Sequence, residues 1–270
     1  MMRAGVVGWP VKHSKSPIIH GHWIAEFDLD AKYTAISLEP DQFEMGIQKL
    51  VKDGYRGCNV TIPHKEAAFQ LADTISPRAE AIGAVNTLVF RDNLIYGDNT
   101  DGIGFLNNIL SVFPQWDASK GPAAVIGAGG AARAIIWALK EANCPEIRIW
   151  NRTIERAASL AEDFGSTVKA IENAPEEACD QALFLVNTSA LGMVGQPELR
   201  LDISSLDPSA IVTDIVYSPL ETQLLQTARV KGHGVVDGFG MLLHQAVPGF
   251  EAWFGVRPTV TKALRAKVLA

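Results

Sequence analysis

A short apolar run that ends in a glycine-rich turn constrains the fold of this chain more than any other segment. The run and turn occupy residues 123–134, which read AAVIGAGGAARA. Gly127 permits a tight turn, Gly129 lets phosphates approach the backbone, and Ala132 is small enough for close packing of a helix on a strand. The helix N-terminus then holds the phosphates. The pattern predicts a dinucleotide-binding turn; the alternative is an ordinary loop with the same glycine spacing.

The residues after this turn indicate which dinucleotide is preferred. The predicted helix covers residues 131–142, and a second apolar run at residues 146–150 completes a βαβ unit. In NAD-binding units an acidic residue after this second strand accepts hydrogen bonds from the ribose. This chain instead has Asn151, Arg152 and Thr153 there, with Arg156 nearby. Arginine suits a phosphate, so we predict NADP in preference to NAD; the alternative is a solvated, charged loop.

The length of the chain and the position of the turn predict two domains. The chain has 270 residues, more than a single hydrophobic core usually serves. We predict a substrate-binding catalytic domain at residues 1–101, completed by residues 240–270, and an NADP-binding Rossmann domain at residues 102–239.

Strand and helix patterns alternate in both parts, which indicates an α/β fold. In the first part we expect strands at residues 3–8, 33–38, 57–61, 84–91 and 94–97, and helices at 18–27, 42–53 and 65–71; a helix at 102–113 leads out of it. The turn Asp92-Asn93 makes the last two of these strands a hairpin. In the second part we expect further strands at 166–170, 182–187, 211–214 and 234–237, and helices near 172–178 and at 222–231. The first domain then has a mostly parallel sheet and the second a doubly wound one, and the amphipathic segments 240–254 and 260–270 pack back on the first domain.

The composition excludes several classes of function. The formal net charge is −6 and the sequence pI is near 5.5, so the chain lacks the basic surface that nucleic acid requires. Its three cysteines show no CxxC spacing, which favours neither a disulfide framework nor a zinc site and fits a cytoplasmic protein. No segment has the pattern of a secretory signal or reaches transmembrane length. We expect neither a nucleic-acid nor a membrane partner.

Short polar side chains gather in the predicted loops of the first domain. They are Ser14, Ser16, Asn59, Thr61, Lys65, Asn86, Thr87, Asn99 and Asp101. Hydroxyls and amides with one lysine suit a small polyhydroxylated acid, because each buried polar substituent of the ligand needs a partner. Hydride transfer between a nicotinamide and a carbonyl also needs a proton donor at the forming alcohol. We therefore expect the substrate at these loops.

A series of ordered motifs resembles the shikimate dehydrogenase family. The motifs are GWPVKHSKSP, GCNVTIPHK, GAVNT, GDNTDG, VIGAGGAARA, NRT, NTSALGM, DIVYSPLET and DGFGMLLHQAVPGFEAW. They extend from Gly5 to about Trp253. The resemblance implies an oxidoreductase that carries out the reversible, NADPH-dependent reduction of 3-dehydroshikimate to shikimate, a step toward the aromatic amino acids.

The resemblance also implies roles for individual residues. It makes Lys65 and Asp101 catalytic: Lys65 protonates the developing alkoxide or polarises the carbonyl, and Asp101 orients both partners. The implied substrate contacts are Ser14, Ser16, Asn59, Thr61, Lys65, Asn86, Asp101, Tyr217 and Gln245. The implied cofactor contacts are Gly127, Ala128, Gly129, Gly130 and Ala131 at the pyrophosphate, Asn151, Arg152, Thr153 and Arg156 at the adenosine phosphate, and Thr188, Ile215, Gly238 and Met241 at the nicotinamide. Met193 is expected near the same wall, with packing as an equally good explanation.

Several of these residues have structural alternatives. Lys65 could lie on the solvated face of a helix, and Asp101 or Ser16 could cap one. Asn86 could be a turn residue and Gln245 an exposed polar residue of a helix. The histidines at positions 13, 20 and 22 lack carboxylates at ligand spacing, so we expect no metal.

Two other functions stay open at this point. One is a quinate/shikimate dehydrogenase that uses NAD, against which Asn151-Arg152-Thr153 argues. The other is a non-catalytic sensor of the shikimate pathway, because a fold does not fix a function. The presence of both Lys65 and Asp101 argues against the sensor. For the oligomeric state, a monomer and a homodimer are both compatible with the sequence.

Overall fold

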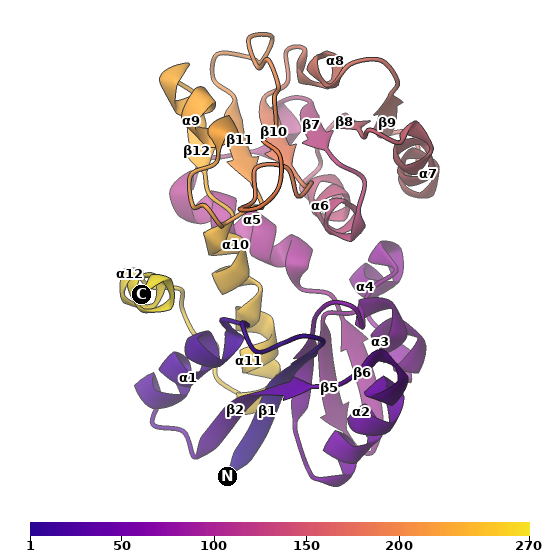
Figure 1. The fold of residues 1–270 in the computed structure, drawn as a ribbon, viewed down its shortest axis with the longest axis vertical. Helices are drawn as coiled ribbons and strands as arrows, with labels where there is room; N and C mark the ends of the chain where they lie inside the picture. The colour runs from indigo at the N-terminus through magenta and orange to yellow at the C-terminus, as the bar shows by residue number, and fades with distance from the viewer. The chain divides into compact units, whose positions relative to one another are not determined.

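The computed structural model describes residues 1–270, and the chain divides into two compact units. Unit 1 comprises Met1–Gly104 together with Leu243–Ala270, and unit 2 comprises Phe105–Leu242. Each unit contains a six-stranded sheet with helices on both faces (Figure 1). The expected α/β class is therefore confirmed. None of the helices is both long enough and apolar enough to cross a lipid bilayer.

The sheet of unit 1 has the strand order β2-β1-β3-β5-β6-β4. Its strands are β1 (Met2–Gly8), β2 (Ala31–Ser37), β3 (Gly57–Val60), β4 (Thr74–Ile75), β5 (Thr87–Arg91) and β6 (Leu94–Asp98). Strand β1 is parallel to β2 and β3, whereas β5 is antiparallel to both β3 and β6. Strands β5 and β6 form the expected hairpin, and Asp92 and Asn93 have φ angles of 53° and 59°, as a tight two-residue turn requires. Because β5 is reversed, its first residue lies at the edge where β1, β3 and β6 end.

Helices cover this sheet on both faces (Figure 1). Helices α2 (Phe43–Lys52) and α3 (Lys65–Leu71) bury Phe43, Ile47 and Ala68 against Val7 and Cys58 of the sheet. Helix α1 (Ser16–Glu26) contacts both α11 (Ala246–Phe254) and α12 (Lys262–Leu269), and α11 packs on β3 and β5. The C-terminal helices therefore pack back on unit 1, as expected.

One contact explains how α11 approaches the sheet so closely. The indole Nε1 of Trp253 donates a hydrogen bond of 2.9 Å to the carbonyl of Leu88 in β5. A Cβ atom at Gly57 would lie 2.2 Å from that same nitrogen, so only glycine leaves room for the indole. The pairing of Gly57 with Trp253 anchors the C-terminal segment on the N-terminal sheet.

The sheet of unit 2 is parallel throughout and has the order β12-β11-β10-β7-β8-β9. Its strands are β7 (Ala123–Ile126), β8 (Ile147–Trp150), β9 (Val168–Ile171), β10 (Phe184–Asn187), β11 (Ile211–Asp214) and β12 (Gly234–Val236). The order runs outward in both directions from β7, which is the doubly wound arrangement expected from the sequence.

The helices of unit 2 lie on opposite faces of its sheet. On one face, α5 (Asp101–Val112), α6 (Gly130–Glu141) and α7 (Ile154–Phe164) bury Phe105, Ile135 and Leu160 in one apolar cluster. On the other face, α8 (Pro175–Cys179) and α9 (Gln223–Val230) bury Ala178 and Leu224 in a second cluster. Strands β7, β10 and β11 are buried along their whole length, as central strands of a parallel sheet usually are.

The structure corrects several details of the expected elements. Helix α4 (Pro77–Ile82), helix α7 and strand β4 were not predicted. Helix α4 has six residues and depends on a local cap, in which Ser76 Oγ accepts a hydrogen bond from Ala79 N. The single segment expected at residues 240–254 is two helices, α10 (Phe239–His244) and α11. Pro248 lacks the N–H group that would bond to the carbonyl of His244 in one continuous helix.

Candidate active site

The polar residues predicted in unit 1 meet at one edge of its sheet. Strands β1, β3 and β6 end there, and Asn86 directly precedes β5 at the same edge. The loops after β1 and β3 carry Ser14 and Thr61, the loop after β3 leads to Lys65 at the start of α3, and the loop after β6 leads to Asp101. The strand directions thus bring residues from four separate motifs together.

Lys65 and Asp101 form an ion pair at this edge. Lys65 is the first residue of α3 and Asp101 the first residue of α5. The Nζ atom of Lys65 lies 2.5 Å from Oδ2 of Asp101, and the two side chains are 33% and 16% exposed. The other carboxylate oxygen, Oδ1, accepts a hydrogen bond of 2.8 Å from Nδ2 of Asn86. Lysine and asparagine together orient the carboxylate, whose partners are side chains rather than the backbone amides that a capping aspartate would bind.

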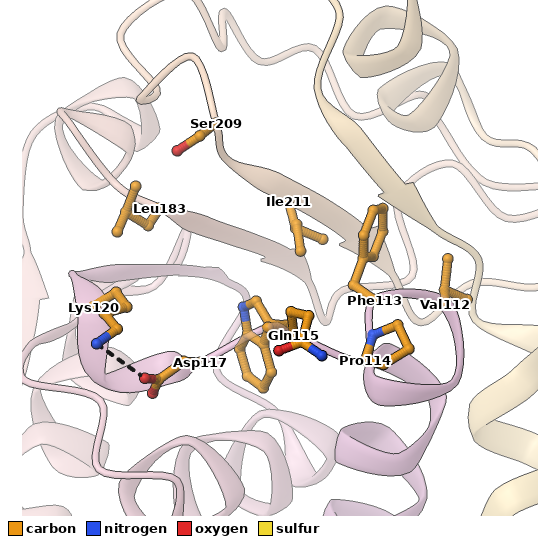
Figure 2. Close-up of a pocket in the computed structure, with 10 residues that line it drawn as sticks. Val112, Phe113, Pro114, Gln115, Asp117, Lys120, Leu183, Ser209 and Ile211 are labelled. Carbon is orange, nitrogen blue, oxygen red and sulfur yellow. Dashed lines mark ion pairs between the residues drawn. The ribbon is translucent and has the colours of Figure 1, made fainter.

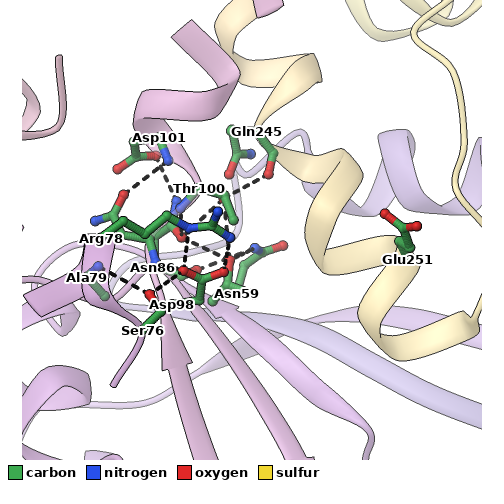
Figure 3. A network of polar contacts seen from close by, with 12 residues as sticks. Asn59, Ser76, Arg78, Ala79, Asn86, Asp98, Thr100, Asp101, Gln245 and Glu251 are labelled. Atoms are coloured by element: carbon green, nitrogen blue, oxygen red, sulfur yellow. Dashed lines mark hydrogen bonds and ion pairs between the residues drawn. The ribbon is translucent and has the colours of Figure 1, made fainter. Parts of the chain in front are cut away.

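Asn86 is the centre of the surrounding network (Figure 3). Its Oδ1 atom accepts hydrogen bonds from Thr100 N and from Thr87 Oγ1, both at 2.9 Å. Its backbone N–H donates to the carbonyl of Asp98, and its own carbonyl accepts from Val60 N. The residue is 3% exposed, so it connects β3, β5 and the loop after β6 rather than merely forming a turn.

Asn59 lies behind Asn86 and has its amide engaged by the protein. Its Oδ1 atom accepts a hydrogen bond of 2.6 Å from the hydroxyl of Tyr33. Its Nδ2 atom donates to Thr87 Oγ1 at 3.3 Å and to the carbonyl of Asn86 at 3.4 Å. Asn59 is 5% exposed, and its hydrogen bonds to the carbonyl of Asn86 and to Thr87 help to hold Asn86 in place.

A second ion pair orders the loop that leads to Asp101. The carboxylate of Asp98 accepts hydrogen bonds from Nε of Arg78 and from Oγ of Ser76, each at 2.6 Å, and from the N–H of Asn99 at 2.8 Å. Burial opposes ionisation of Asp98, but the hydrogen bonds from Arg78 and Ser76 outweigh it and hold the pKa below its ordinary value. Neither Arg78 nor Asp98 was predicted from the sequence; the position of Asp98 inside the motif GDNTDG was the available signal.

The remaining predicted substrate residues of unit 1 have the following positions. Oγ of Ser14 accepts a hydrogen bond of 3.3 Å from the N–H of Ser16. Ser16 is the first residue of α1 and Lys15 occupies the N-cap position, so the capping role considered for Ser16 is wrong. Thr61 follows β3 and is half-buried. Gln245 is half-buried rather than exposed, and its carbonyl accepts a hydrogen bond of 2.8 Å from Thr100 Oγ1.

In unit 2 the glycine turn has the geometry that a bound dinucleotide needs. Gly127 has a φ of 109°, and a Cβ atom there would lie 2.7 Å from Oγ1 of Thr188. Cβ atoms at Gly129 and Gly130 would instead have no heavy atom within 4 Å. Helix α6 begins at Gly130 without a side-chain cap. The turn is therefore closed toward the sheet and open above the helix N-terminus, where a pyrophosphate fits.

The segment after β8 lies against this turn. Oδ1 of Asn151 accepts a hydrogen bond of 3.2 Å from the N–H of Ala128, and Nδ2 donates to the carbonyl of Thr153 at 2.8 Å. Asn151 thus ties this segment to the turn. Arg152 and Arg156 are exposed, and neither forms an ion pair. Two uncompensated cations beside the turn fit the extra phosphate of NADP.

The other predicted cofactor residues follow β10, β11 and β12: Thr188 and Ile215 lie directly after β10 and β11, Gly238 lies shortly after β12, and Met241 lies in α10. Thr188 is 7% exposed, and its hydroxyl donates to the carbonyl of Ile126 at 2.9 Å. A Cβ atom at Gly238 would lie 2.4 Å from the carbonyl oxygen of Ile215, so glycine lets these two loops meet. Met241 is half-buried against the unit 2 core, whereas Met193 is 40% exposed.

Tyr217, predicted to contact substrate, differs from the other substrate candidates because it belongs to unit 2. It is 43% exposed, and its ring centroid lies 6.1 Å from that of Phe239. Its role toward the substrate stays a prediction.

Unit 2 also contains a pocket that none of its predicted cofactor residues lines (Figure 2). It has a volume of about 440 Å³ and is lined by Phe113, Pro114, Trp116 and Ile211 among others. Ile211 begins β11 and Leu183 precedes β10, so the pocket lies at the amino edge of the parallel sheet. Ligands of doubly wound sheets bind at the opposite, carboxyl edge, so we assign the pocket no part in the site.

Comparisons with known proteins agree with this geometry. The family model described as the shikimate dehydrogenase substrate binding domain matches residues 6–88, and the model described as shikimate / quinate 5-dehydrogenase matches residues 110–215. The chain is 54% identical to shikimate dehydrogenase (NADP(+)) of Mesorhizobium japonicum over 269 residues, which cover 99% of this chain and 96% of that protein.

Solved structures also resemble the whole chain, including the following two. Shikimate 5-dehydrogenase from Thermus thermophilus, in complex with NADP(H) and shikimate, is 36% identical with a TM-score of 0.89 and covers 100% of this chain and 99% of its own. Quinate dehydrogenase from Corynebacterium glutamicum, in complex with NAD, is 28% identical with a TM-score of 0.91 and covers 99% and 98%.

Proposed function

Because the chain belongs to the shikimate dehydrogenase family, we propose that it catalyses the reversible, NADPH-dependent reduction of 3-dehydroshikimate to shikimate. The observation that carries this proposal is the ion pair of Lys65 and Asp101, 2.5 Å apart and oriented by Asn86. A sensor that only binds its ligand has no need of a proton donor held in this way. The reaction is a step in the biosynthesis of aromatic amino acids.

The substrate residues would act as follows. Lys65, as an ammonium group, donates a proton to the oxygen of the carbonyl as it becomes an alkoxide, and it accepts the proton back in the reverse direction. The carboxylate of Asp101 orients the ammonium group of Lys65 and binds one substrate hydroxyl, and Asn86 orients that carboxylate through a hydrogen bond. The nicotinamide, when bound, supplies or accepts the hydride.

The remaining contacts orient a small polyhydroxylated acid. The hydroxyls of Ser14 and Ser16 donate hydrogen bonds to the substrate carboxylate, because an ionised carboxylate accepts hydrogen bonds but cannot donate them. Thr61, Gln245 and Tyr217 bind ring hydroxyls. Asn59 contributes chiefly through Asn86, since its amide oxygen and nitrogen already have partners in the protein.

The cofactor residues would divide along the dinucleotide. Gly127, Ala128, Gly129, Gly130 and Ala131 hold the pyrophosphate at the start of α6, where a Cβ atom at Gly129 or Gly130 would meet nothing. Asn151, Arg152, Thr153 and Arg156 bind the adenosine phosphate, supported by the two unpaired arginines. Thr188, Ile215, Gly238 and Met241 border the nicotinamide.

These roles divide the chain into two functional domains. We propose residues 1–101 and 240–270 as the substrate-binding catalytic domain and residues 102–239 as the NADP-binding domain. We further propose that the protein works in the cytoplasm, which its three free, buried cysteines favour, and that it is a monomer or a homodimer.

One experiment tests the proposed activity against its alternatives. Purified protein is mixed with shikimate or quinate and with NADP⁺ or NAD⁺, and reduction of the cofactor is followed by absorbance. Of the four combinations, we expect rapid reduction of the cofactor only with shikimate and NADP⁺. Faster turnover of quinate with NAD⁺ would support the quinate/shikimate dehydrogenase, an alternative that the likeness to the Corynebacterium glutamicum enzyme makes worth testing. Binding of shikimate without any reduction would support the sensor.

A further inference from the structure

Two fully buried polar residues of unit 2 take no part in the proposed reaction. Asn187 is the last residue of β10 and Asp214 the last residue of β11, and the two are partners in the parallel register of these strands. Both are 0% exposed, and Nδ2 of Asn187 lies 3.0 Å from Oδ1 of Asp214. A carboxyl group is rarely buried completely unless hydrogen bonds compensate for its loss of solvation.

The side chain of Asn187 organises the loop after β10. Its Oδ1 atom accepts hydrogen bonds from the N–H of Ser189 at 3.0 Å and from the hydroxyl of Ser189 at 2.7 Å. Its Nδ2 atom donates to the carbonyl of Leu191 at 3.0 Å as well as to Asp214. Because the oxygen receives only donors, the orientation of this amide is determined by its partners.

The side chain of Asp214 organises the loop after β11 in the same way. Oδ1 accepts from the N–H of Val216 at 3.0 Å, and Oδ2 accepts from the hydroxyl of Thr222 at 2.7 Å. The two loops also meet directly, because Val194 N donates to the carbonyl of Ser218 at 2.8 Å. The Asn187–Asp214 pair is therefore a single buried link that fixes both loops.

The strand order shows which part of a dinucleotide these loops would meet. The glycine turn follows β7, and the segment with Arg152 follows β8 on one side of it. Strands β10 and β11 lie on the other side of β7 (Figure 1). A dinucleotide that crosses the carboxyl edge with its adenosine phosphate beyond β8 must place its other half over β10 and β11.

We propose that the Asn187–Asp214 pair positions the loops that bind the nicotinamide half of NADP(H), and that it does not influence the adenosine half. The inference rests on the proposed function, since it assumes that NADP(H) binds at this edge. Asn187 and Asp214 are positioning residues: they act through Thr188 and Ile215, which directly follow them in the chain.

The chain offers a matched control for a purely structural role. Thr213, one residue before Asp214 in β11, is 2% exposed, and its hydroxyl donates a hydrogen bond of 2.8 Å to the carbonyl of Val236. The variant T213V removes a buried hydrogen bond from the same strand but leaves both loops untouched. The variant D214N keeps the shape of the side chain, and its new amide can donate to the Thr222 hydroxyl.

The experiment compares the Kd values of NADPH and of adenosine 2′,5′-bisphosphate, which represents only the adenosine half, together with the Tm of each variant. For D214A we expect NADPH binding to weaken about tenfold or more, because the buried donors of Asn187, Val216 and Thr222 lose their acceptor. The Kd of the bisphosphate should stay within about twofold. D214N should bind both ligands nearly as the unsubstituted chain does, and T213V should lower Tm without changing either Kd.

Other outcomes would overturn the inference. Equal weakening of both ligands by D214A, or a lower Tm with no change in NADPH binding, would mean that the pair serves stability alone. If D214A does not fold, T222V and T222S give the same test, with T222V expected to weaken NADPH and T222S to restore it; equal affinities for these two would overturn the inference. Absence of NADPH binding by the unsubstituted chain would instead overturn the proposed function itself.

Discussion

The Nζ atom of Lys65 lies 2.5 Å from Oδ2 of Asp101, although the two residues begin different helices, α3 and α5. The pair exists because β3 and β6 end at the same edge of the sheet and each delivers a helix start there. Neither helix alone would create it. The pair is the chemical centre of the proposed reaction.

Removing the lysine should remove the proton donor. We expect K65A to lower kcat by about 10²-fold to 10⁴-fold, the usual contribution of a general acid or base. The matched control is K49A, which removes a lysine whose pair with Asp53 spans 2.8 Å on the exposed surface of α2. Steady-state kinetics with NADPH and 3-dehydroshikimate checks both variants. Near-native turnover by K65A would exclude Lys65 as the donor.

Two glycines of the turn should respond differently to alanine. G127A introduces a Cβ atom 2.7 Å from Thr188 Oγ1 at a φ of 109°, so we expect it to destabilise unit 2. The expected loss in the free energy of unfolding is about 1–3 kcal/mol. G129A meets no protein atom within 4 Å, so it should fold normally yet bind NADPH more weakly, because its methyl group enters the space of the pyrophosphate. Thermal unfolding and NADPH titration separate the two effects; unchanged NADPH affinity in G129A would argue against a pyrophosphate at this turn.

The arginines after β8 should discriminate between the two nicotinamide cofactors. We expect R152Q or R156Q to raise the KM for NADPH by about tenfold to a hundredfold, since each removes a charge-assisted hydrogen bond to the phosphate. The KM for NADH should not change. R257Q removes an exposed arginine of unit 1 that pairs with Glu251 at 2.6 Å, and it should alter neither constant. A parallel rise in both KM values would mean that the arginines do not read the 2′-phosphate.

His20 should make the protein sensitive to acid. Its ring is fully buried and stacks on Tyr33 at 4.0 Å between ring centroids. Burial lowers the pKa of His20 from 6.5 to about 3. Between these pH values the unfolded chain binds a proton that the folded chain does not, so stability falls as the pH falls. The slope from this residue approaches about 1.4 kcal/mol per pH unit.

Urea unfolding of H20F at several pH values checks this prediction. Phenylalanine keeps an aromatic ring in the cluster but cannot titrate, so the stability of H20F should depend less on pH below pH 6.5 than that of the unsubstituted chain. F250L is the control, because Phe250 lies 5.8 Å from His20 between ring centroids and carries no titratable group. It should lower stability by the same amount at every pH. Identical pH slopes in H20F and the unsubstituted chain would contradict the assignment.

Much of unit 2 could be predicted because its signals are local. Strand β11 has the predicted bounds, Ile211–Asp214, since an apolar run between turns is typical of a buried parallel strand. Helix α7 was missed although Ala157, Leu160 and Phe164 lie on one buried face of it. Charged residues stand between these apolar positions in the sequence, although they lie on the other face of the helix, so the continuous apolar runs of the neighbouring strands were easier to recognise.

The polar network of unit 1 could not be predicted to the same extent. Lys65, Asn86 and Asp101 stand in motifs, but the partners that hold them come from distant segments. Tyr33 reaches Asn59 across 26 residues, and Arg78 reaches Asp98 across 20. Such pairings follow from strand order and register, which no local pattern specifies.

The specificity constants of the unsubstituted protein test the central claim most directly. Initial rates of 3-dehydroshikimate reduction are measured with NADPH and with NADH under the same conditions, and kcat/KM is compared for the two cofactors. Because two unpaired arginines and no carboxylate follow β8, we predict a kcat/KM for NADPH at least about a hundredfold above that for NADH. Comparable values for the two cofactors, or no reduction of 3-dehydroshikimate with either, would contradict it.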